Sequence, residues 1–492
     1  MSAEIVPTTP QRERGVRRSM PFSDRIVEGT VACIDIVAVM LCGLVGYVMI
    51  VGWQPSTAEF YVSSVFMTCL VFYALLRYGE LCSISVVMRP FLYFDKMLLS
   101  VATAFLLLLA TLFSLKVSDT FSRLWMYTFA ASSFATVFTL RLLIQVILKR
   151  VSDLGLVTRN VVVVGSGEQA KVLLERFGAA RPYFTTVIGL FATGEGHASG
   201  GSVGDYRVLG DVEALFQMVR QRRIDDVILA VPWSDDQAIM HLLERLREIP
   251  VTIHLACDLV GFRLDLARTQ LFGDPNTTRF PGVPVVEISK RPQADWDVVV
   301  KAVEDRVLAA ALLVLFSPLM LLVAVAIKLS SPGPILFRQE RLGFNNQRFE
   351  IYKFRSMRHE PGYSGITEQA TKGDPRVTAV GKFIRRTSID ELPQLLNVLN
   401  GTMSLVGPRP HAIVHNEIYS NQIRGYFARH RVKPGLTGWA QVNGFRGETP
   451  LLSLMEKRVQ HDLYYVENWS LGFDIQIMLK TALIVITGRN AY

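Results

Sequence analysis

Four long apolar runs in the first third of the chain constrain its fold more than any other feature. They cover residues 30–53, 60–76, 97–115 and 125–148. Each has on the order of 20 residues, the length at which an α-helix crosses about 30 Å of hydrocarbon. A lipid-exposed backbone must satisfy its own hydrogen bonds, so these runs predict a four-helix transmembrane bundle over residues 29–150. The 50 % content of hydrophobic residues and the mean hydropathy of +0.30 exclude an ordinary soluble protein.

Basic residues beside these runs predict that both ends of the bundle lie in the cytoplasm. A basic tail over residues 1–28 carries five arginines, and Lys149 and Arg150 follow the fourth run, whereas residues 54–59 contain no lysine or arginine. The run after the tail is too long for a cleavable signal peptide and lacks a small-residue cleavage site. Arg141 lies inside the fourth run, where it is expected to snorkel or to face the bundle interior.

Net charge limits the kinds of partner that the chain would bind, and the cysteine pattern limits the kinds of metal site. The net charge is +9, and beside membrane segments this favours anionic lipid or phosphorylated substrates over nucleic acid. The 5 cysteines form no CxxC pair and no Cys/His cluster, which indicates reduced, structural thiols and no zinc site.

Residues 158–273 read as a Rossmann-like α/β domain. The segment VVVVGSGEQA, residues 161–170, predicts a buried strand that leads into a Gly-rich turn and a helix. The GxGxxA pattern alone is a weak signal. The next strand ends in Ala192 and Thr193, where a dinucleotide-binding domain would place an acidic residue for the ribose. We therefore expect a structural or regulatory role rather than a working NAD site. A linker rich in Pro, Thr and Gly follows over residues 274–295.

An acidic pair stands in the segment RRTSIDELPQLLNVLNGTMSLVGPRP, residues 385–410. Pro393 follows Asp390 and Glu391 and is best tolerated in the first turn of a helix, so the acids should lie at or just before a helix start. Arg385 precedes them and Arg409, between two prolines, follows. Such a pair alone is typical of a solvated helix start with salt bridges. Together with arginines it indicates phosphate chemistry with a divalent metal.

At these residues the sequence resembles a known family. The segment SIDELPQLLNVLNGTMSLVGPRP, together with KFRSM at residues 353–357 and KPGLTGWAQVNG at residues 433–444, is similar to the bacterial sugar transferases. These polyprenyl-phosphate hexose-1-phosphate transferases are also called monotopic phosphoglycosyl transferases. The resemblance covers residues 296–492, and the layout of the whole chain looks like the large subclass. GFRGET and the C-terminal ending look most like undecaprenyl-phosphate glucose phosphotransferases.

The resemblance implies a mainly α-helical catalytic domain and a two-step reaction in the bacterial inner membrane. Asp390 would be the nucleophile, and Glu391 would bind Mg²⁺. A sugar-1-phosphate, by subclass glucose-1-phosphate with galactose as the runner-up, would pass from a UDP-sugar to undecaprenyl phosphate with release of UMP. This is the first membrane step of exopolysaccharide or capsule assembly. Lys353 and Arg355 alternate in an extended segment and would contact phosphates from one face. Arg385 and Arg409 would clamp phosphates in the same way.

A fifth apolar run, residues 307–327, has the length of a transmembrane helix. Basic residues flank it on both sides, Lys301 before it and Lys328 after it. Ser317 and Pro318 lie in its middle, where proline breaks the backbone ladder and serine can satisfy the freed carbonyl. We expect a kinked, re-entrant helix, as the resembled family has, that keeps the catalytic domain on the cytoplasmic face. The alternative is an ordinary kinked transmembrane helix.

Other polar residues favour structural roles. We expect Asp374 in a turn and His411 and His415 in structural positions, while Trp439 and Gln441 shape either a nucleotide pocket or a structural loop. The apolar run at residues 474–487 is short and predicts an interfacial or core helix.

Two other classes of function compete with the transferase. A membrane-tethered nucleotide-sugar oxidoreductase or dehydratase would use the α/β domain, but residues 159–271 contain no YxxxK pair. A non-catalytic scaffold for polysaccharide export would not need the DE, KFRSM and PRP motifs. Membrane lipids are the expected surroundings, and a homo-oligomer is compatible with the sequence.

Overall fold

The computed structural model describes residues 23–154, 158–180, 183–193, 201–204, 206–221, 224–257, 280, 283–358, 374–445, 447 and 451–487. The tail before residue 23 and residues 274–279 of the linker lie outside this set. The chain forms two compact units. One comprises residues 1–159, 180–186 and 267–282, and the other comprises residues 160–179, 187–266 and 283–492.

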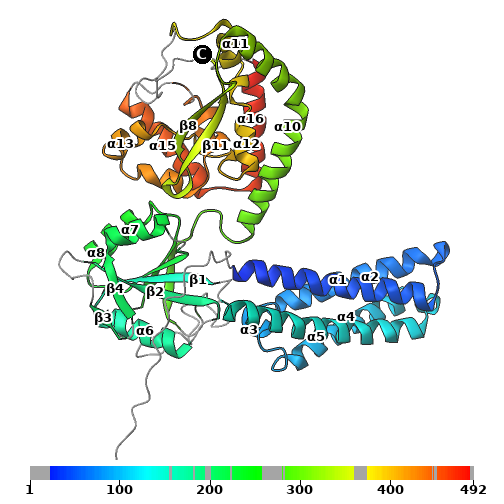
Figure 1. Cartoon of the computed structure of the whole chain (residues 1–492). Helices are drawn as coiled ribbons and strands as arrows, with labels where there is room; N and C mark the ends of the chain where they lie inside the picture. The colour runs from blue at the N-terminus through cyan, green and yellow to red at the C-terminus, as the bar shows by residue number, and fades with distance from the viewer. Residues whose placement is uncertain are drawn as a thin grey trace, which may run out of the picture. The chain divides into compact units, whose positions relative to one another are not determined.

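The first unit contains the predicted helical bundle. Its long helices are α1 (Asp24–Ile50), α2 (Pro55–Tyr78), α4 (Phe94–Ser114) and α5 (Arg123–Asp153), with the short α3 (Ile84–Val87) and the 3-10 turn η1 (Ser118–Thr120) between them. Figure 1 shows the four long helices packed along one another. Each is long and apolar enough to cross a membrane, so the four predicted runs form helices that are candidate spans. Ser23 and Ser122 cap α1 and α5 by accepting hydrogen bonds from the first turn.

Aromatic residues fill the centre of the bundle. Tyr61 stacks on Tyr47 with ring centroids 4.6 Å apart and meets Trp125 edge-on at 4.7 Å. Trp125 donates from its indole Nε1 to the Gly43 carbonyl at 3.0 Å. A Cβ atom at Gly43 would lie 2.5 Å from Val65, so only glycine lets these helices approach so closely.

A buried ion pair also joins the helices. Arg141 faces the interior, one of its two predicted orientations, and its Nε donates to the Asp35 carboxylate at 2.9 Å. It also donates to the Leu81 carbonyl at 2.8 Å. Both charged side chains are almost fully buried. The pair therefore ties α1 to α5, and the Leu81 contact adds the chain between α2 and α3.

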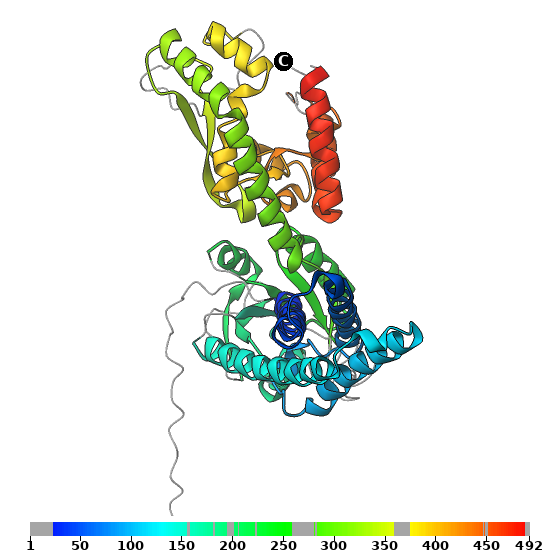
Figure 2. The ribbon, with the colours of Figure 1, turned by 90° about the vertical axis from the view of Figure 1, so that its right-hand side faces the viewer.

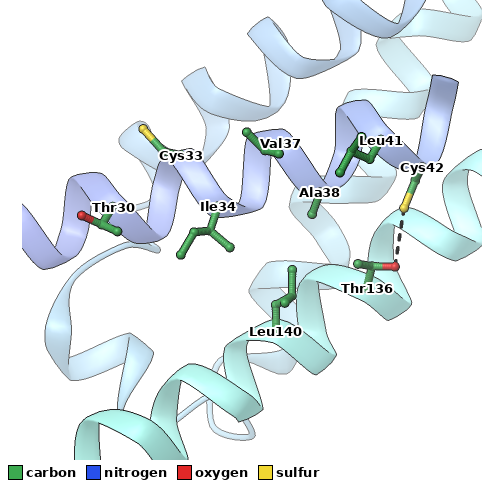
Figure 3. Close-up of a pocket in the computed structure, with 9 residues that line it drawn as sticks. All are labelled: Thr30, Cys33, Ile34, Val37, Ala38, Leu41, Cys42, Thr136 and Leu140. Carbon is green, nitrogen blue, oxygen red and sulfur yellow. Dashed lines mark hydrogen bonds between the residues drawn. The ribbon is translucent and has the colours of Figure 1, made fainter. Parts of the chain in front are cut away.

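A groove of about 410 Å³ lies between α1 and α5. Figure 3 shows its wall, which is apolar apart from Thr30, Cys33, Cys42 and Thr136. Cys42 and Thr136 contact each other at 3.5 Å. No ionisable group other than these thiols lines the groove, so it offers nothing that could act on a phosphate.

The middle of the chain forms a seven-stranded sheet in the order β3-β4-β2-β1-β5-β6-β7. The strands are β1 (Arg159–Val164), β2 (Thr185–Ala192), β3 (Ser202–Val203), β4 (Tyr206–Asp211), β5 (Asp226–Leu229), β6 (Thr252–Ala256) and β7 (Val285–Ser289), and the helices are α6 (Glu168–Ala180), α7 (Val212–Gln221) and α8 (Asp236–Leu246). Pairing is antiparallel at both edges and parallel for the inner pairs β2–β4, β1–β5 and β5–β6. This confirms the Rossmann-like prediction.

The Gly-rich turn after β1 serves the packing of this sheet. Gly165 has a φ of +134°, and a Cβ there would lie 2.3 Å from the Ala230 carbonyl. Gln169, buried in the first turn of α6, donates to the Cys257 carbonyl at 2.7 Å. Its side chain therefore ties the start of α6 to the end of β6.

The last 200 residues form a mainly helical domain with two small sheets. Its elements are α10 (Trp296–Ser330), β8 (Leu336–Leu342), η4 (Phe344–Asn346), β9 (Arg348–Phe354), α11 (Ala379–Arg386), η5 (Ile389–Glu391), α12 (Gln394–Leu399), β10 (Ser404–Val406), α13 (Ile413–Ser420), η6 (Tyr426–Arg431), β11 (Gly435–Thr437), α14 (Trp439–Val442), α15 (Leu452–Glu467) and α16 (Leu471–Thr487). β8 and β9 form an antiparallel hairpin, and β10 pairs with β11 in parallel.

Helix α10 stays helical through Pro318, and Figure 2 shows it as one long helix (green). Proline leaves the Val314 carbonyl without its backbone donor, and the Ser317 hydroxyl donates to that carbonyl at 2.9 Å. The predicted role of the serine is confirmed. Entry and exit of α10 on one membrane face stays a prediction.

Buried charges anchor the start of α10. The Lys301 ammonium lies 2.7 Å from Asp474 of α16 and 3.0 Å from Asp305 of its own helix. Asp474 also accepts hydrogen bonds from Tyr465 and from Trp469, each at 2.9 Å. Asp474 and Ile477 are fully buried, so one face of α16 packs in this domain, while Leu479 and Leu483 are exposed. The choice between an interfacial and a core helix stays a prediction.

Candidate active site

The two predicted acids lie on a short turn that the local sequence determines. Helix α11 ends at Arg386, and Ser388 adopts a left-handed conformation with φ +60°. The 3-10 turn η5 then carries Asp390 and Glu391, and α12 starts just after Pro393. The acids therefore stand just before a helix, as the proline predicts. Because α12 has only 6 residues, its dipole contributes little to anion binding.

Glu391 is held by cations from two other elements. Lys353 of β9 donates to its Oε1 at 2.8 Å. Arg409 donates to Oε1 at 2.6 Å and to Oε2 at 3.2 Å. Burial would raise the pKa of Glu391, but the charges and hydrogen bonds of Arg409 and Lys353 outweigh it and hold the pKa well below its usual range. Glu391 is therefore a carboxylate at all physiological pH values.

Asp390 has a different environment from its neighbour. Among the described residues its carboxylate has no hydrogen bond and no ion pair. Burial, followed by the negative charge of Glu391, raises its pKa to about 6, although Lys353, Arg409 and Arg385 act in the opposite direction. The site thus presents one fixed carboxylate and one carboxylate that is free to react.

Arg385 and Arg341 complete the positive surroundings of the acids. Arg385, in the last turn of α11, is close enough to lower the pKa of Asp390. Arg341 of β8 interacts electrostatically with Arg409 and Glu391, and burial lowers its own pKa to about 10. With Lys353 and Arg409, the site holds two more positive than negative groups, which suits a diphosphate.

Arg341 is a site residue that sequence reasoning missed. The sequence feature that could have drawn attention to Arg341 is the hairpin, because β8 pairs with the strand that carries Lys353. Arg341 pairs with Phe349, four residues from Lys353 along β9, and forms a further bridge with Ala412 after the PRP motif. This bridge brings Arg341 to the segment that follows Arg409, and the motif patterns alone did not include β8.

Arg355 corrects the expectation that KFRSM presents two cations to phosphate. Strand β9 ends at Phe354, so the alternation of side chains stops before Arg355. Its guanidinium instead donates to the Pro332 carbonyl at 2.8 Å and to the Ser331 carbonyl at 2.6 Å. Arg355 therefore caps the chain that leaves α10, and only Lys353 reaches the acids.

A buried network holds the backbone of the PRP motif in place. Arg429 of η6 donates to the Arg409 carbonyl at 2.7 Å and pairs with Asp462 of α15 at 2.7 Å. His411 bonds to Tyr426 at 2.6 Å. Burial and the nearby charge of Arg429 hold the pKa of His411 well below its usual range, so the imidazole is neutral. The predicted structural role of His411 agrees with this arrangement.

The remaining predicted residues take part in packing. Asp374 accepts a hydrogen bond from the Arg376 backbone at 3.0 Å, which gives the predicted turn. Trp439 packs edge-on against Phe473 of α16 with centroids 5.0 Å apart. Gln441 is buried beside it. Both residues lie in the short helix α14 rather than in a loop, and the packing of Trp439 on α16 agrees with a structural role.

The donor set suits a metal ion that binds partly through substrate. No group of three or more His, Cys, Asp or Glu side chains gathers anywhere in the described part of the chain. Mg²⁺ commonly uses one or two carboxylates and completes its shell with phosphate oxygens and water. Glu391 would be such a carboxylate, because among the described residues its Oε2 atom accepts a hydrogen bond from Arg409 alone.

Comparison with known proteins shows which families and relatives this chain resembles. Residues 296–488 match the model described as "Bacterial sugar transferase", and residues 83–257 match a "CoA-binding domain". The chain is 38 % identical over 380 residues to a UDP-glucose:undecaprenyl-phosphate glucose-1-phosphate transferase of Xanthomonas campestris pv. campestris, covering 77 % of each chain.

Two further relatives match shorter parts of the chain at higher identity. A UDP-glucose:undecaprenyl-phosphate glucose-1-phosphate transferase of Caulobacter vibrioides is 53 % identical over 39 % of this chain and 72 % of its own. A UDP-N-acetylgalactosamine-undecaprenyl-phosphate N-acetylgalactosaminephosphotransferase of Aeromonas hydrophila is 47 % identical over 38 % of this chain and 43 % of its own.

Proposed function

The chain belongs to the bacterial sugar transferase family, and from this premise we propose that it transfers glucose-1-phosphate from UDP-glucose to undecaprenyl phosphate. The observation that carries the proposal is the contrast between the two acids. Glu391 is fixed by Lys353 and Arg409, whereas Asp390 beside it has no such partner in the described part of the chain and is the group that we propose attacks.

In the first step Asp390 acts as the nucleophile. One oxygen of its carboxylate attacks the β-phosphorus of the UDP-sugar and forms an acyl-phosphate bond. The bond from that phosphorus to the bridging oxygen breaks, and UMP leaves with this oxygen. Lys353, Arg409 and Arg341 face the diphosphate and offset the charge that develops on its oxygens.

In the second step the lipid acceptor regenerates the acid. A phosphate oxygen of undecaprenyl phosphate attacks the same phosphorus, and the bond to Asp390 breaks. The products are the polyprenyl diphosphate sugar and the free carboxylate. Two successive displacements at one site agree with this pair of acids, because Lys353 and Arg409 hold the neighbouring carboxylate, Glu391.

We propose Mg²⁺ as the cofactor, with Glu391 as its main protein ligand. The ion would neutralise charge on the phosphates of both substrates. Within the protein, Lys353 and Arg409 keep Glu391 ionised and oriented. This fixed carboxylate is available whether or not Asp390 is protonated.

The glucose assignment rests on the relatives that align along most of the chain. The Xanthomonas protein aligns with 77 % of this chain and is named for glucose. The Aeromonas protein aligns with 38 % of this chain and is named for N-acetylgalactosamine. We also propose that the catalytic domain faces the cytoplasm, where nucleotide sugars are made.

A UMP-release assay tests the proposal. The full-length protein in detergent receives undecaprenyl phosphate, Mg²⁺ and one of UDP-glucose, UDP-galactose or UDP-N-acetylgalactosamine. We expect UMP and a lipid-linked sugar with UDP-glucose, at a kcat/KM at least about tenfold higher than with the other two. A preference for another sugar would contradict the glucose assignment, and no UMP with any sugar would contradict the transferase proposal.

A further inference from the structure

One buried amide close to the two acids has no hydrogen-bond partner. Gln394 is the first residue of α12 and is only 2 % exposed. Its Nε2 atom is buried, and the side chain forms no hydrogen bond with any of the described residues. Buried polar groups in native proteins nearly always have a partner, because a lone one destabilises the fold. The Gln394 amide therefore calls for a partner that the described part of the chain does not supply.

The other buried amide of α12 has partners at both ends. Asn397 is also 2 % exposed. Its Nδ2 atom donates to the Glu350 carbonyl at 2.7 Å, and its Oδ1 atom accepts from the Tyr352 backbone N–H at 3.0 Å. Asn397 thus ties α12 to β9. Gln394 differs from it, because no such bond fixes the Gln394 amide to a neighbouring element.

Gln394 lies one helical turn from the acids. It follows Glu391 by three residues and Asp390 by four, and Leu392 and Pro393 between them have right-handed helical backbone angles. Side chains three and four residues apart share one face of a helix. A long side chain also points back over the preceding turn. These spacings place the Gln394 side chain on the side of the turn that carries the acids.

The acids do not use this donor. The Glu391 carboxylate accepts from Lys353 and Arg409, and the Asp390 carboxylate accepts no hydrogen bond among the described residues. A reactive carboxylate and a buried amide donor therefore stand one turn apart, each without a partner. A phosphoryl group on Asp390 would bring its own oxygens to this turn, and these oxygens accept hydrogen bonds.

We propose that the Gln394 amide donates a hydrogen bond to a non-bridging oxygen of the β-phosphoryl group during its transfer to and from Asp390. The inference rests on the proposed function and adds a neutral donor to the cations of the site. The phosphorus must come within bonding distance of Asp390, so its oxygens are the substrate atoms nearest to this turn. An amide stabilises the charge that grows on them. A lysine at this position would instead pair with Asp390 before the substrate arrived.

Removing the donor while keeping the shape of the side chain tests the proposal. Gln394→Met keeps an unbranched side chain and has no N–H donor. The full-length protein in detergent receives Mg²⁺ and UDP-glucose without acceptor, and UMP release is followed over a single turnover. We expect the maximal rate to fall by about 10²-fold, because the donor acts on charge that develops in the transition state. The UDP-glucose concentration that gives half of this rate should change by less than about threefold. Gln422→Met, at an exposed glutamine of the same domain, is the matched control and should react like the wild type.

Thermal unfolding without substrate separates this role from a structural one. Gln394→Met removes a buried polar group that has no partner, so its unfolding temperature should equal or exceed that of the wild type. Asn397→Leu breaks the bonds to Glu350 and Tyr352 and should unfold at a lower temperature. Activity lost at full stability is the result that a merely structural glutamine would not give.

Gln394→Leu serves as a second variant if methionine does not fit the site. A wild-type rate of UMP release in a folded Gln394 variant would overturn the proposal. Loss of UMP release together with a lower unfolding temperature in both variants would also overturn it, because the amide would then hold the fold, directly or through a buried water molecule. Absence of UMP release from the wild-type protein would instead overturn the proposed function, so the two failures are distinct.

Discussion

At the scale of single residues, the environments of Asp390 and Glu391 divide the work of the site. Both side chains are acids, and both are removed from bulk water. Arg409 and Lys353 lower the pKa of Glu391 and keep it charged, whereas burial and the negative charge of Glu391 raise the pKa of Asp390. The ordering of these two pKa values separates the fixed group from the reactive one.

Exchanging each acid for its amide should give different losses. Asp390→Asn cannot form an acyl phosphate, so single-turnover UMP release should fall by about 10⁴-fold or more. Glu391→Gln should lose about 10²- to 10³-fold, because Lys353 and Arg409 lose their partner and the metal loses a ligand. Surface Glu417→Gln on α13 serves as the control. Near-normal turnover by Asp390→Asn would remove the nucleophile assignment.

The pKa of Asp390 predicts the pH dependence of the first step. Only the carboxylate attacks, and its pKa is raised to about 6, so UMP release should fall as the pH drops through 6. Well below this midpoint the rate should decrease about tenfold per pH unit. Arg385→Gln removes a charge that lowers this pKa, so its midpoint should lie at higher pH. A midpoint near 4 in both proteins would contradict the prediction.

Motifs predicted the acids and their main partners, but not every cation around them. The spacing of Pro393 placed Asp390 and Glu391 before a helix, and the structure agrees. Arg341 was missed because its position depends on strand pairing. Arg355 was misjudged because the alternation rule holds only inside a strand, and β9 ends one residue earlier.

At the scale of helices, removing one partner of the buried Arg141–Asp35 pair should destabilise the bundle. Asp35→Ala leaves a buried guanidinium without its counter-ion, which costs roughly 3–5 kcal/mol. Thermal unfolding in detergent should show this loss, and the double variant Asp35→Leu/Arg141→Met should recover much of it. Arg123→Met, an exposed position on the same helix, is the control. Equal unfolding temperatures for all four proteins would contradict the prediction.

The topology of α10 gives a second prediction at this scale. Asp297→Cys and Gln347→Cys, in a cysteine-free background, place thiols at exposed positions on either side of the apolar run. Lys301 is unsuitable as a reporter because it is buried in its ion cluster. If α10 re-enters, a membrane-impermeant reagent should label both thiols only after the inner membrane is opened.

A straight crossing would give a different pattern. The Gln347→Cys protein would then react in intact spheroplasts while the Asp297→Cys protein stayed protected, which would refute re-entry. Pro318→Ala removes a break that costs roughly 3 kcal/mol inside a helix, so it should make the crossing easier.

At the scale of the whole chain, the reactive groups gather in one part of the sequence. Lys353, Asp390, Glu391 and Arg409 all lie after Trp296. A membrane-inserted fragment that begins at Trp296 should therefore release UMP from UDP-glucose, at a rate within about tenfold of the full chain. A fragment that folds, as judged by circular dichroism, yet releases no UMP would show that the earlier domains contribute to the site.

The sequence predicted large parts of the architecture from length and periodicity alone. Four apolar runs became four helices, and the alternation of strands and amphipathic helices became a parallel sheet. What it did not predict are the contacts that join distant segments, such as Asp35 with Arg141 or Lys301 with Asp474. Each depends on which helices become neighbours, and periodicity within one helix does not contain that information.

Three glycines near β10 and β11 are positions that relatives would keep for packing alone, although their invariance could be taken as a sign of function. A Cβ at Gly407 would lie 2.4 Å from the Lys433 carbonyl, at Gly435 it would lie 2.1 Å from the Gly407 nitrogen, and at Gly438 it would lie 2.2 Å from the Gly407 carbonyl. No side chain fits at these three positions. They should therefore stay invariant across evolution even in homologues that have lost the reaction, so their invariance would diagnose the fold, whereas change at Asp390 would diagnose loss of the chemistry.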